Sequence, residues 1–146
     1  MLKISRARVI AIISLVAASC GSSSPCRNCP PVDGTYSVRW DMDGGVNMSC
    51  PGPRLPSWTL SQRDTQITTT IAGIPLGGTL YDSYDLLLTG GQTGLTYRLK
   101  ALAIPEGGTA DAGMRLVGSF LTRTTPVDGG EACESNEGFT AQRTSR

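Results

Sequence analysis

Five cysteines are the residues of this chain best suited to chemistry: Cys20, Cys26, Cys29, Cys50 and Cys133. The Cys26-x-x-Cys29 spacing is that of redox-active dithiols, in which a helix N-terminus lowers the pKa of one thiol. Here two prolines follow directly and no βαβ pattern surrounds the motif, so we expect no redox role. A four-cysteine zinc site is disfavoured because the other two cysteines are scattered. The default prediction is two disulfides in an oxidising compartment.

Histidine is absent from the sequence, which excludes His-activated nucleophiles, His-rich zinc sites and a histidine general base. The run Asp41-Met42-Asp43-Gly44 begins like a calcium loop but lacks the later acidic ligands at the required spacing. Neither a nucleophile elbow nor a pair of catalytic carboxylates is evident among the serines and acidic residues. We therefore expect a protein that is not an enzyme and that holds no metal and no cofactor.

Charge gives little indication of a polyanionic partner. The formal net charge is +1 at pH 7, and the basic residues after the N-terminal region occur singly along the chain. Such spacing is typical of solvated strand faces and not of a phosphate-binding stripe. We expect no nucleic-acid partner.

The first twenty residues have the organisation of a signal peptide. Lys3, Arg6 and Arg8 form a basic region, and the apolar stretch Val9–Ala18 follows it. That stretch is about half as long as a membrane-spanning helix, which fits a secretory signal and not a transmembrane anchor. The sequence therefore predicts export.

The run from Val16 to Cys20, Val-Ala-Ala-Ser-Cys, resembles the lipobox of bacterial lipoproteins, with Ala17 where the commonest motif has Leu. This resemblance implies cleavage before Cys20 and attachment of a diacylglycerol and a further acyl chain such as palmitate to Cys20. Gly21 directly after the cysteine resembles lipoproteins that are sorted to the outer membrane. An ordinary secretory signal, cleaved between Ala17 and Ser19, is the alternative.

Three regions follow from this interpretation. Residues 1–19 are the signal peptide, and residues 20–33 are the lipid-attachment cysteine and a flexible Gly-, Ser- and Pro-rich tether. Residues 34–146 then form one domain, because a chain of this length supports a single modest core.

From Gly34 onward, short runs of alternating apolar and polar residues are separated by Gly, Pro, Asp and Ser, which predicts an all-β domain. The short links favour an antiparallel up-and-down meander. About eight strands suffice for such a sheet to close as a small barrel. The strands are expected at 35–40, 57–62, 66–71, 78–82, 84–89, 95–103, 112–123 and 138–143, with loops at 75–78, 90–94 and 105–108.

Closure of the barrel makes a prediction about the cysteines. It places the last strand antiparallel to the first, and it brings the loops 41–56 and 124–137 to the same end. Cys50 and Cys133 then come within reach of a disulfide that staples the seam. Cys26 and Cys29 either pair with each other or remain a dithiol.

Gly34-x-Tyr36 on the first strand and Arg143 on the last resemble the lipocalin arrangement, in which a Gly-x-Trp on strand one packs under an arginine of the final strand. Here Tyr replaces the Trp. The resemblance implies a barrel that carries a small apolar molecule. The inward-facing aromatic residues that could line its pocket are Tyr36, Trp40, Trp58, Tyr97 and Phe120.

The same inward residues could instead fill the barrel completely, and we expect a packed core. The leading functional interpretation is therefore a lipid-anchored cell-envelope lipoprotein with a non-enzymatic structural or binding role. Two alternatives stay open: a lipocalin-like carrier of a small apolar ligand, and a lipoprotein that assists envelope assembly or binds another envelope protein through its loops.

Overall fold

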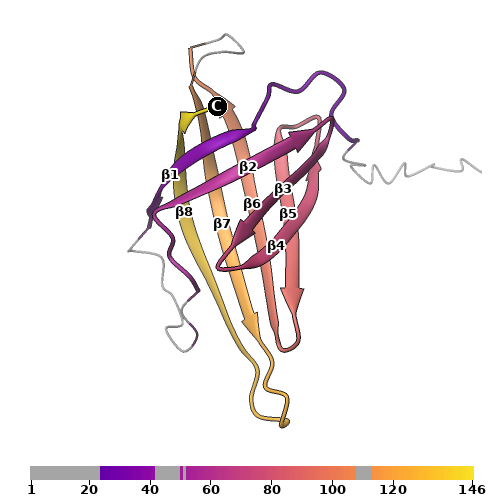
Figure 1. Ribbon diagram of the computed structural model, residues 1–146, viewed down its shortest axis with the longest axis vertical. Helices are drawn as coiled ribbons and strands as arrows, with labels where there is room; N and C mark the ends of the chain where they lie inside the picture. The colour runs from indigo at the N-terminus through magenta and orange to yellow at the C-terminus, as the bar shows by residue number, and fades with distance from the viewer. Residues whose placement is uncertain (1–23, 42–49, 51, 108–112) are drawn as a thin grey trace, which may run out of the picture.

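The computed structural model describes residues 24–41, 50, 52–107 and 113–146, and within these residues the chain is an eight-stranded antiparallel β-barrel (Figure 1). Each strand pairs with the next along the sequence, and β8 returns to pair with β1. The described residues contain no helix long and apolar enough to cross a membrane. The strands are β1 (Gly34–Trp40), β2 (Ser57–Arg63), β3 (Gln66–Ile71), β4 (Ile74–Leu80), β5 (Asp85–Gln92), β6 (Leu95–Pro105), β7 (Met114–Thr124) and β8 (Cys133–Ser145).

Closure occurs through the pairing of the first and last strands, as the sequence predicts. Trp40 pairs with Phe139 and Val38 with Ala141, in antiparallel register. Phe139 and Ala141 are fully buried, so this face of β8 points into the barrel. Side-chain direction alternates along a strand, and the pairing register therefore fixes which residues form the core.

Burial alternates along every strand, and alternate residues fill the interior. In β6, for example, Tyr97, Leu99, Ala101 and Ala103 are buried while Arg98 between them is exposed. The buried set combines large rings such as Phe120 and Phe139 with small residues such as Ala101 and Ala141, and such a mixture can fill a closed interior of this size. Trp40, the last residue of β1, is only half-buried.

Several strand boundaries differ from the sequence prediction, most clearly the starts of β4 and β8 and the end of β5, which continues to Gln92 through the predicted loop 90–94. β4 begins at Ile74, so Pro75 and Gly77 belong to a strand and not to a loop. The turn lies earlier, at Ala72 and Gly73, whose φ angles are 49° and 79°, because a two-residue hairpin favours positive φ at both central positions. β8 begins at Cys133, five residues before the predicted start, and extends the wall beyond the core.

We call the two ends of the barrel the N-terminal end and the loop end. The N-terminal end holds residues 24–33, the β2–β3 and β4–β5 turns and the C-terminus, and it is uppermost in Figure 1. The loop end holds Cys50 and the β7–β8 turn.

Residues 24–33 lie against the N-terminal end and do not hang free of the barrel. Cys26 N donates to Leu80 O at 3.1 Å, and Asp82 N donates to Ser24 O at 3.0 Å. Val32 is fully buried, and its N–H donates to Gln62 Oε1 at 2.7 Å. This part of the expected tether is therefore fixed to the β4–β5 hairpin and to β2.

Candidate functional site

Four of the five cysteines form two disulfides. Cys50 pairs with Cys133 across the loop end, with Cα atoms 5.8 Å apart, which confirms the seam staple. Cys26 pairs with Cys29, with Cα atoms 5.6 Å apart, which decides between the two expected states of that motif. Cys20, the expected lipid-attachment residue, lies outside the described residues.

Four of the five aromatic residues expected to line a pocket contact one another. Trp40 lies edge-on to Trp58 with ring centroids 5.8 Å apart, and it contacts Phe120 at 6.1 Å. Tyr97 lies 5.1 Å from Phe120. Phe139 completes the cluster at 4.6 Å from Trp58. Such edge-on contacts are the preferred packing of aromatic rings in a core, so these side chains fill the space that a ligand in this region would need.

Tyr36 belongs to the N-terminal end instead. Its hydroxyl donates to Val32 O at 2.8 Å, and its side chain is fully buried. Burial raises the pKa of Tyr36 to about 12; Arg143 nearby lowers it, and the carboxylate of Asp33 raises it. A buried phenol with its hydroxyl bonded to a carbonyl is a structural group, and it closes this end of the barrel.

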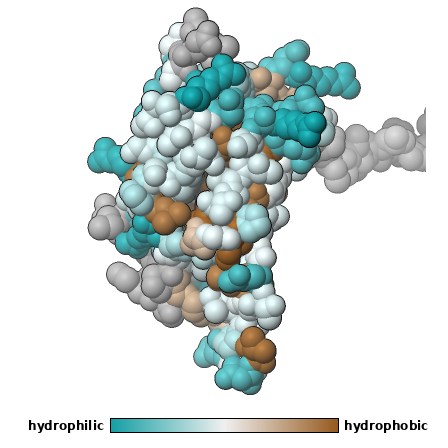
Figure 2. Space-filling view, in the orientation of Figure 1, coloured by the Kyte–Doolittle hydropathy of each residue, from teal (hydrophilic) through white to brown (hydrophobic). Residues whose placement is uncertain are grey.

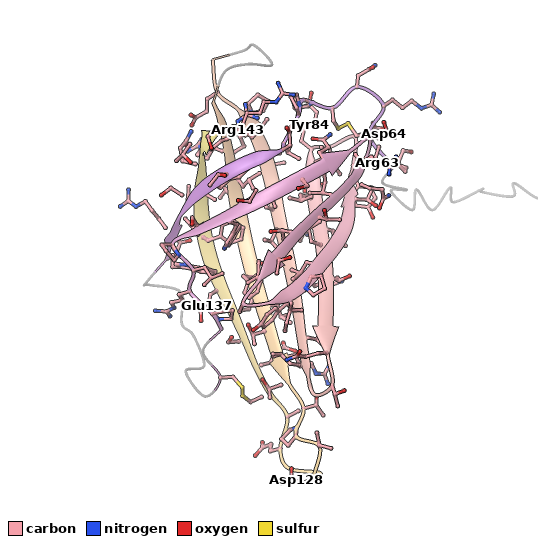
Figure 3. The ribbon with its side chains drawn as sticks, in the orientation of Figure 1. Arg63, Asp64, Tyr84, Asp128, Glu137 and Arg143 are labelled. Carbon is pink, nitrogen blue, oxygen red and sulfur yellow. A yellow bond between two sulfur atoms is a disulfide. The ribbon has the colours of Figure 1, made fainter. Side chains whose placement is uncertain are left out.

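Arg143 lies at the same end (Figure 3), where the lipocalin resemblance placed it. Tyr36 and Arg143 pair directly across β1 and β8. Nη1 of Arg143 donates to Pro31 O at 2.9 Å and to Asp33 O at 3.4 Å. A Cβ on Gly34 would lie 2.9 Å from Cδ of Arg143, and the φ of Gly34 is 136°. Glycine is therefore favoured at this position, because its φ angle and the nearby backbone of Ser145 both disfavour a side chain.

A buried carboxylate at the loop end was not anticipated from the sequence. Glu137 is 2% exposed, and its Oε2 accepts from Nε of Arg54 at 2.6 Å. Its Oε1 accepts from Gly52 N at 3.4 Å. The segment before β2 thereby covers the end of the barrel. The sequence held a usable signal, because Glu137 has the same strand parity as the predicted inward residues Phe139 and Ala141.

Two parts of the outer wall differ in their surface chemistry. We call the first the hydroxyl wall: the outward residues of β2 and β3, all exposed, are mostly Ser and Thr. Figure 2 shows this face as largely pale, with the strongly hydrophilic side chains nearer its ends. A groove of about 770 Å³ lies in this wall, here named the β2–β3 groove. Its outward-facing lining residues are Ser57, Thr59, Ser61, Thr68, Thr70, Pro75 and Gly77.

We call the second surface the aliphatic wall, formed by outward residues of β5, β6 and β7. Leu102 and Val117 pair across β6 and β7 and are 42% and 39% exposed. A smaller groove of about 420 Å³ lies beside them, with Arg98 and Lys100 among its lining residues. Within the described part of the chain, neither cation forms an ion pair. The wall otherwise includes Leu87 and Leu121.

The described residues do not bring together a group of three His, Cys, Asp or Glu side chains that could hold a metal ion, and Asp43 of the calcium-like run lies outside them. Comparison with known proteins gives no family: no family model, no curated protein and no solved structure matches this chain. The function must therefore be inferred from the arrangement itself. What the barrel offers chemically is a filled interior and two unlike outer surfaces.

Proposed function

We propose that this chain is a lipid-anchored cell-envelope protein with a non-enzymatic binding role, and that it binds through the outer wall of its barrel. The observation that carries the proposal is the pairing of the cysteines. Cys26 bonds to Cys29 and Cys50 to Cys133, and the remaining cysteine is the one in the lipobox-like run. Two disulfides favour an exported protein. A lipid on Cys20 would be added after export.

The fixed segment 24–33 supports a short anchor. Four residues span at most about 14 Å, so a lipid on Cys20 would hold Ser24 and the N-terminal end of the barrel close to the membrane surface. Ser24 O accepts from Asp82 N, and Asp82 Oδ1 accepts from Arg27 N at 3.2 Å. The barrel would consequently keep a defined end toward the bilayer, with its outer wall accessible to other envelope components. The outer membrane is the expected location.

The packing of the interior weighs against the carrier alternative. An apolar ligand between Trp40, Trp58 and Phe120 would have to separate rings that now lie 5.8 to 6.1 Å apart. The loop alternative has less support than the wall, because Glu137 and Arg54 hold part of the loop end against the barrel. The exposed groove and the aliphatic wall are better placed to bind a partner.

The lipid anchor is tested by replacing Cys20→Ser in the full chain and expressing it in bacteria fed a radiolabelled palmitate. We expect the unchanged chain to carry label and to fractionate with membranes. Cys20→Ser should carry no label and appear in the soluble fraction, because the apolar stretch alone is too short to span the bilayer. Ser22→Ala is the matched control and should behave like the unchanged chain. Label on Cys20→Ser, or membrane retention of its cleaved form, would refute the anchor.

A further inference from the structure

Within the part of the chain that the structure describes, β2 leaves part of its edge without a strand partner. Its first half, Ser57 to Leu60, pairs with β1, whereas only its second half, Ser61 to Arg63, pairs with β3. Figure 1 shows the two strands diverging away from the turn that joins them. The β2–β3 groove lies in this opening of the wall. Its sides are therefore two strand edges.

Alternation along β2 determines which backbone groups face the groove. Val38 N donates to Pro56 O at 2.8 Å, so Pro56 directs its carbonyl toward β1. Successive residues of a strand direct their N–H and C=O groups to opposite sides, so Ser57 and Thr59 direct theirs toward β3. Thr59 O indeed accepts from Oγ1 of Thr69 on β3 at 2.8 Å. Among the described residues, no strand pairs with Ser57 N–H, Ser57 C=O or Thr59 N–H.

The opposite side of the groove is built in the same way. Ser61 faces β3 by the same alternation and pairs with Thr68, so Thr68 and Thr70 direct their backbone groups toward β2. A continued ladder would pair Thr70 with Thr59, but the register stops at Thr68. The N–H and C=O of Thr70 thus also face the groove, across from the free edge of β2.

We propose that the β2–β3 groove binds a short extended peptide segment of a partner protein by strand addition to the free edge of β2. Its backbone would pair with the N–H and C=O of Ser57 and with the N–H of Thr59, while Thr59 O keeps its bond to Oγ1 of Thr69. Thr70 would lie on its other side. Unpaired strand edges bind extended peptide backbones, with affinity from main-chain hydrogen bonds and selectivity from alternate side chains. The volume, about 770 Å³, is within the range of binding pockets.

The composition of the groove selects the kind of peptide. None of the residues that line it is charged, and most carry a hydroxyl group. A segment of neutral, β-branched or hydroxylic residues therefore fits, whereas a highly charged one gains no ion pair. Trp58, also a lining residue, has its indole Nε1 buried without a hydrogen-bond partner among the described residues. This inference specifies the partner for the binding role proposed above and does not depend on the lipid anchor.

Amide hydrogen exchange followed by NMR tests the free edge first. The probe is the full chain with both disulfides formed, purified in detergent. Amides of Trp58 and Leu60 should exchange slowly, because they face β1, and those of Ser57, Thr59 and Thr70 should exchange rapidly. Addition of the peptide acetyl-Thr-Val-Thr-Val-Thr-Lys-amide should slow exchange at these three amides at least tenfold. The same peptide with proline in place of both valines, which lacks the N–H donors of those two positions, should not.

Two variants then test the location of the peptide. Ser57→Pro removes a groove-facing N–H at the first residue of a strand, where proline is tolerated. Gly77→Gln places a side chain over the groove, and a Cβ on Gly77 would meet no atom within 4 Å. Each should weaken peptide binding at least fivefold. Ser57→Ala and the exposed outer-wall variant Thr96→Gln are the matched controls and should change binding less than twofold.

Several outcomes would overturn the proposal. These are slow exchange at Ser57 and Thr59 in the free protein, absence of binding by the valine-containing peptide, or equal binding by Gly77→Gln. Binding of maltotriose at the groove with no binding of the peptide would replace the partner peptide by a glycan. None of these results bears on palmitate labelling of Cys20, so failure of this inference and failure of the lipid anchor are distinguishable.

Discussion

The two outer walls of the barrel differ although they cover the same kind of core. On the aliphatic side, every residue of β6 from Leu95 to Pro105 pairs with β7. On the hydroxyl side, only Ser61 to Arg63 of β2 pair with β3. The interior pattern requires apolar residues on both sides, but the outward residues are free to vary. Among the described strands, the long and fully paired ladder therefore lies on the aliphatic side, and the free part of the β2 edge lies on the hydroxyl side.

Removal of the seam disulfide should cause the largest loss of stability. The Cys50–Cys133 bond closes a separation of 83 residues, whereas the Cys26–Cys29 bond closes a separation of 3. The chain-entropy relation gives about 4.5 kcal/mol for the first and about 2 kcal/mol for the second. We expect the double variant Cys50→Ala/Cys133→Ala to lose about twice as much free energy of unfolding as Cys26→Ala/Cys29→Ala, measured by urea denaturation.

Hydrogen exchange in the seam variant would sharpen the comparison. Amides of β1 and β2 should lose protection before those of β6 and β7, because the shorter ladders open first. Uniform loss of protection over all eight strands would contradict the division into a rigid and a loosely paired part.

Substitution of one glycine on each side of the barrel should produce the next largest difference in stability. A Cβ on Gly118 of β7 would lie 2.0 Å from Lys100 O and 2.6 Å from Cα of Ala101, whereas a Cβ on Gly77 of β4 would meet nothing within 4 Å. Overpacking of this kind typically costs about 1 to 3 kcal/mol and occasionally more. We expect Gly118→Ala to destabilise by about 3 kcal/mol and Gly77→Ala to be neutral or slightly stabilising, as read from thermal and urea unfolding. Equal losses would show that the two sides are packed alike.

Alkaline pH should distinguish β1 from β6 through their buried tyrosines, Tyr36 and Tyr97. The pKa of Tyr36 is about 12 in the folded chain, against an ordinary value of 10, because burial favours the neutral phenol. The unfolded chain therefore loses this proton first as pH rises. The stabilisation is fully present below pH 10 and is lost between about pH 10 and pH 12, up to about 2.7 kcal/mol for two pKa units.

The measurement is the free energy of unfolding at pH 9 and pH 11.5, compared between the unchanged chain and Tyr36→Phe. The unchanged chain should lose about 2 kcal/mol more than Tyr36→Phe over this interval. Burial also raises the pKa of Tyr97 on β6, and we expect Tyr97→Phe to remove a smaller part of the alkaline loss. Identical pH profiles for the unchanged chain and Tyr36→Phe would contradict the raised pKa.

Replacement of exposed aliphatic residues by threonine should have the smallest effect on stability. Leu102→Thr/Val117→Thr gives the aliphatic wall the outward residue type of the hydroxyl wall. Both positions are partly exposed and lie in fully paired strands, so we expect a change within about 0.5 kcal/mol in thermal unfolding. Binding of the dye ANS should fall, because less apolar surface is exposed. A loss of several kcal/mol would show that these side chains pack as core.

Much of the fold follows from period-two alternation in the sequence. The inward positions of β1, β6 and β8 and the seam disulfide were predictable, because strand parity and short links leave few ways to close eight strands. The start of β4 was not predictable by this approach, since Pro75, Gly77 and Gly78 have the composition of a turn. Pro75 is accommodated because it pairs with Thr70, whose backbone faces β2, so no proline N–H is needed.

The candidate groove could not be predicted from residue types. It depends on the point at which β2 leaves β3 and on the side to which Thr59 directs its backbone, and both are properties of register. The runs of Ser and Thr in β2 and β3 give the same alternation whether or not the strands stay paired. Glu137 illustrates the opposite case, because its parity marked it as inward while its charge suggested a loop.

The attachment of residues 24–29 to the β4–β5 hairpin has a mechanical consequence. A pull applied upstream of Ser24 is borne first by the bonds from Asp82 N to Ser24 O and from Cys26 N to Leu80 O. The Cys26–Cys29 bond limits how far the backbone between them can extend. Tension is thus delivered to β4 and β5 before it reaches Gly34, and the short ladders on either side of β2 are shielded from the load.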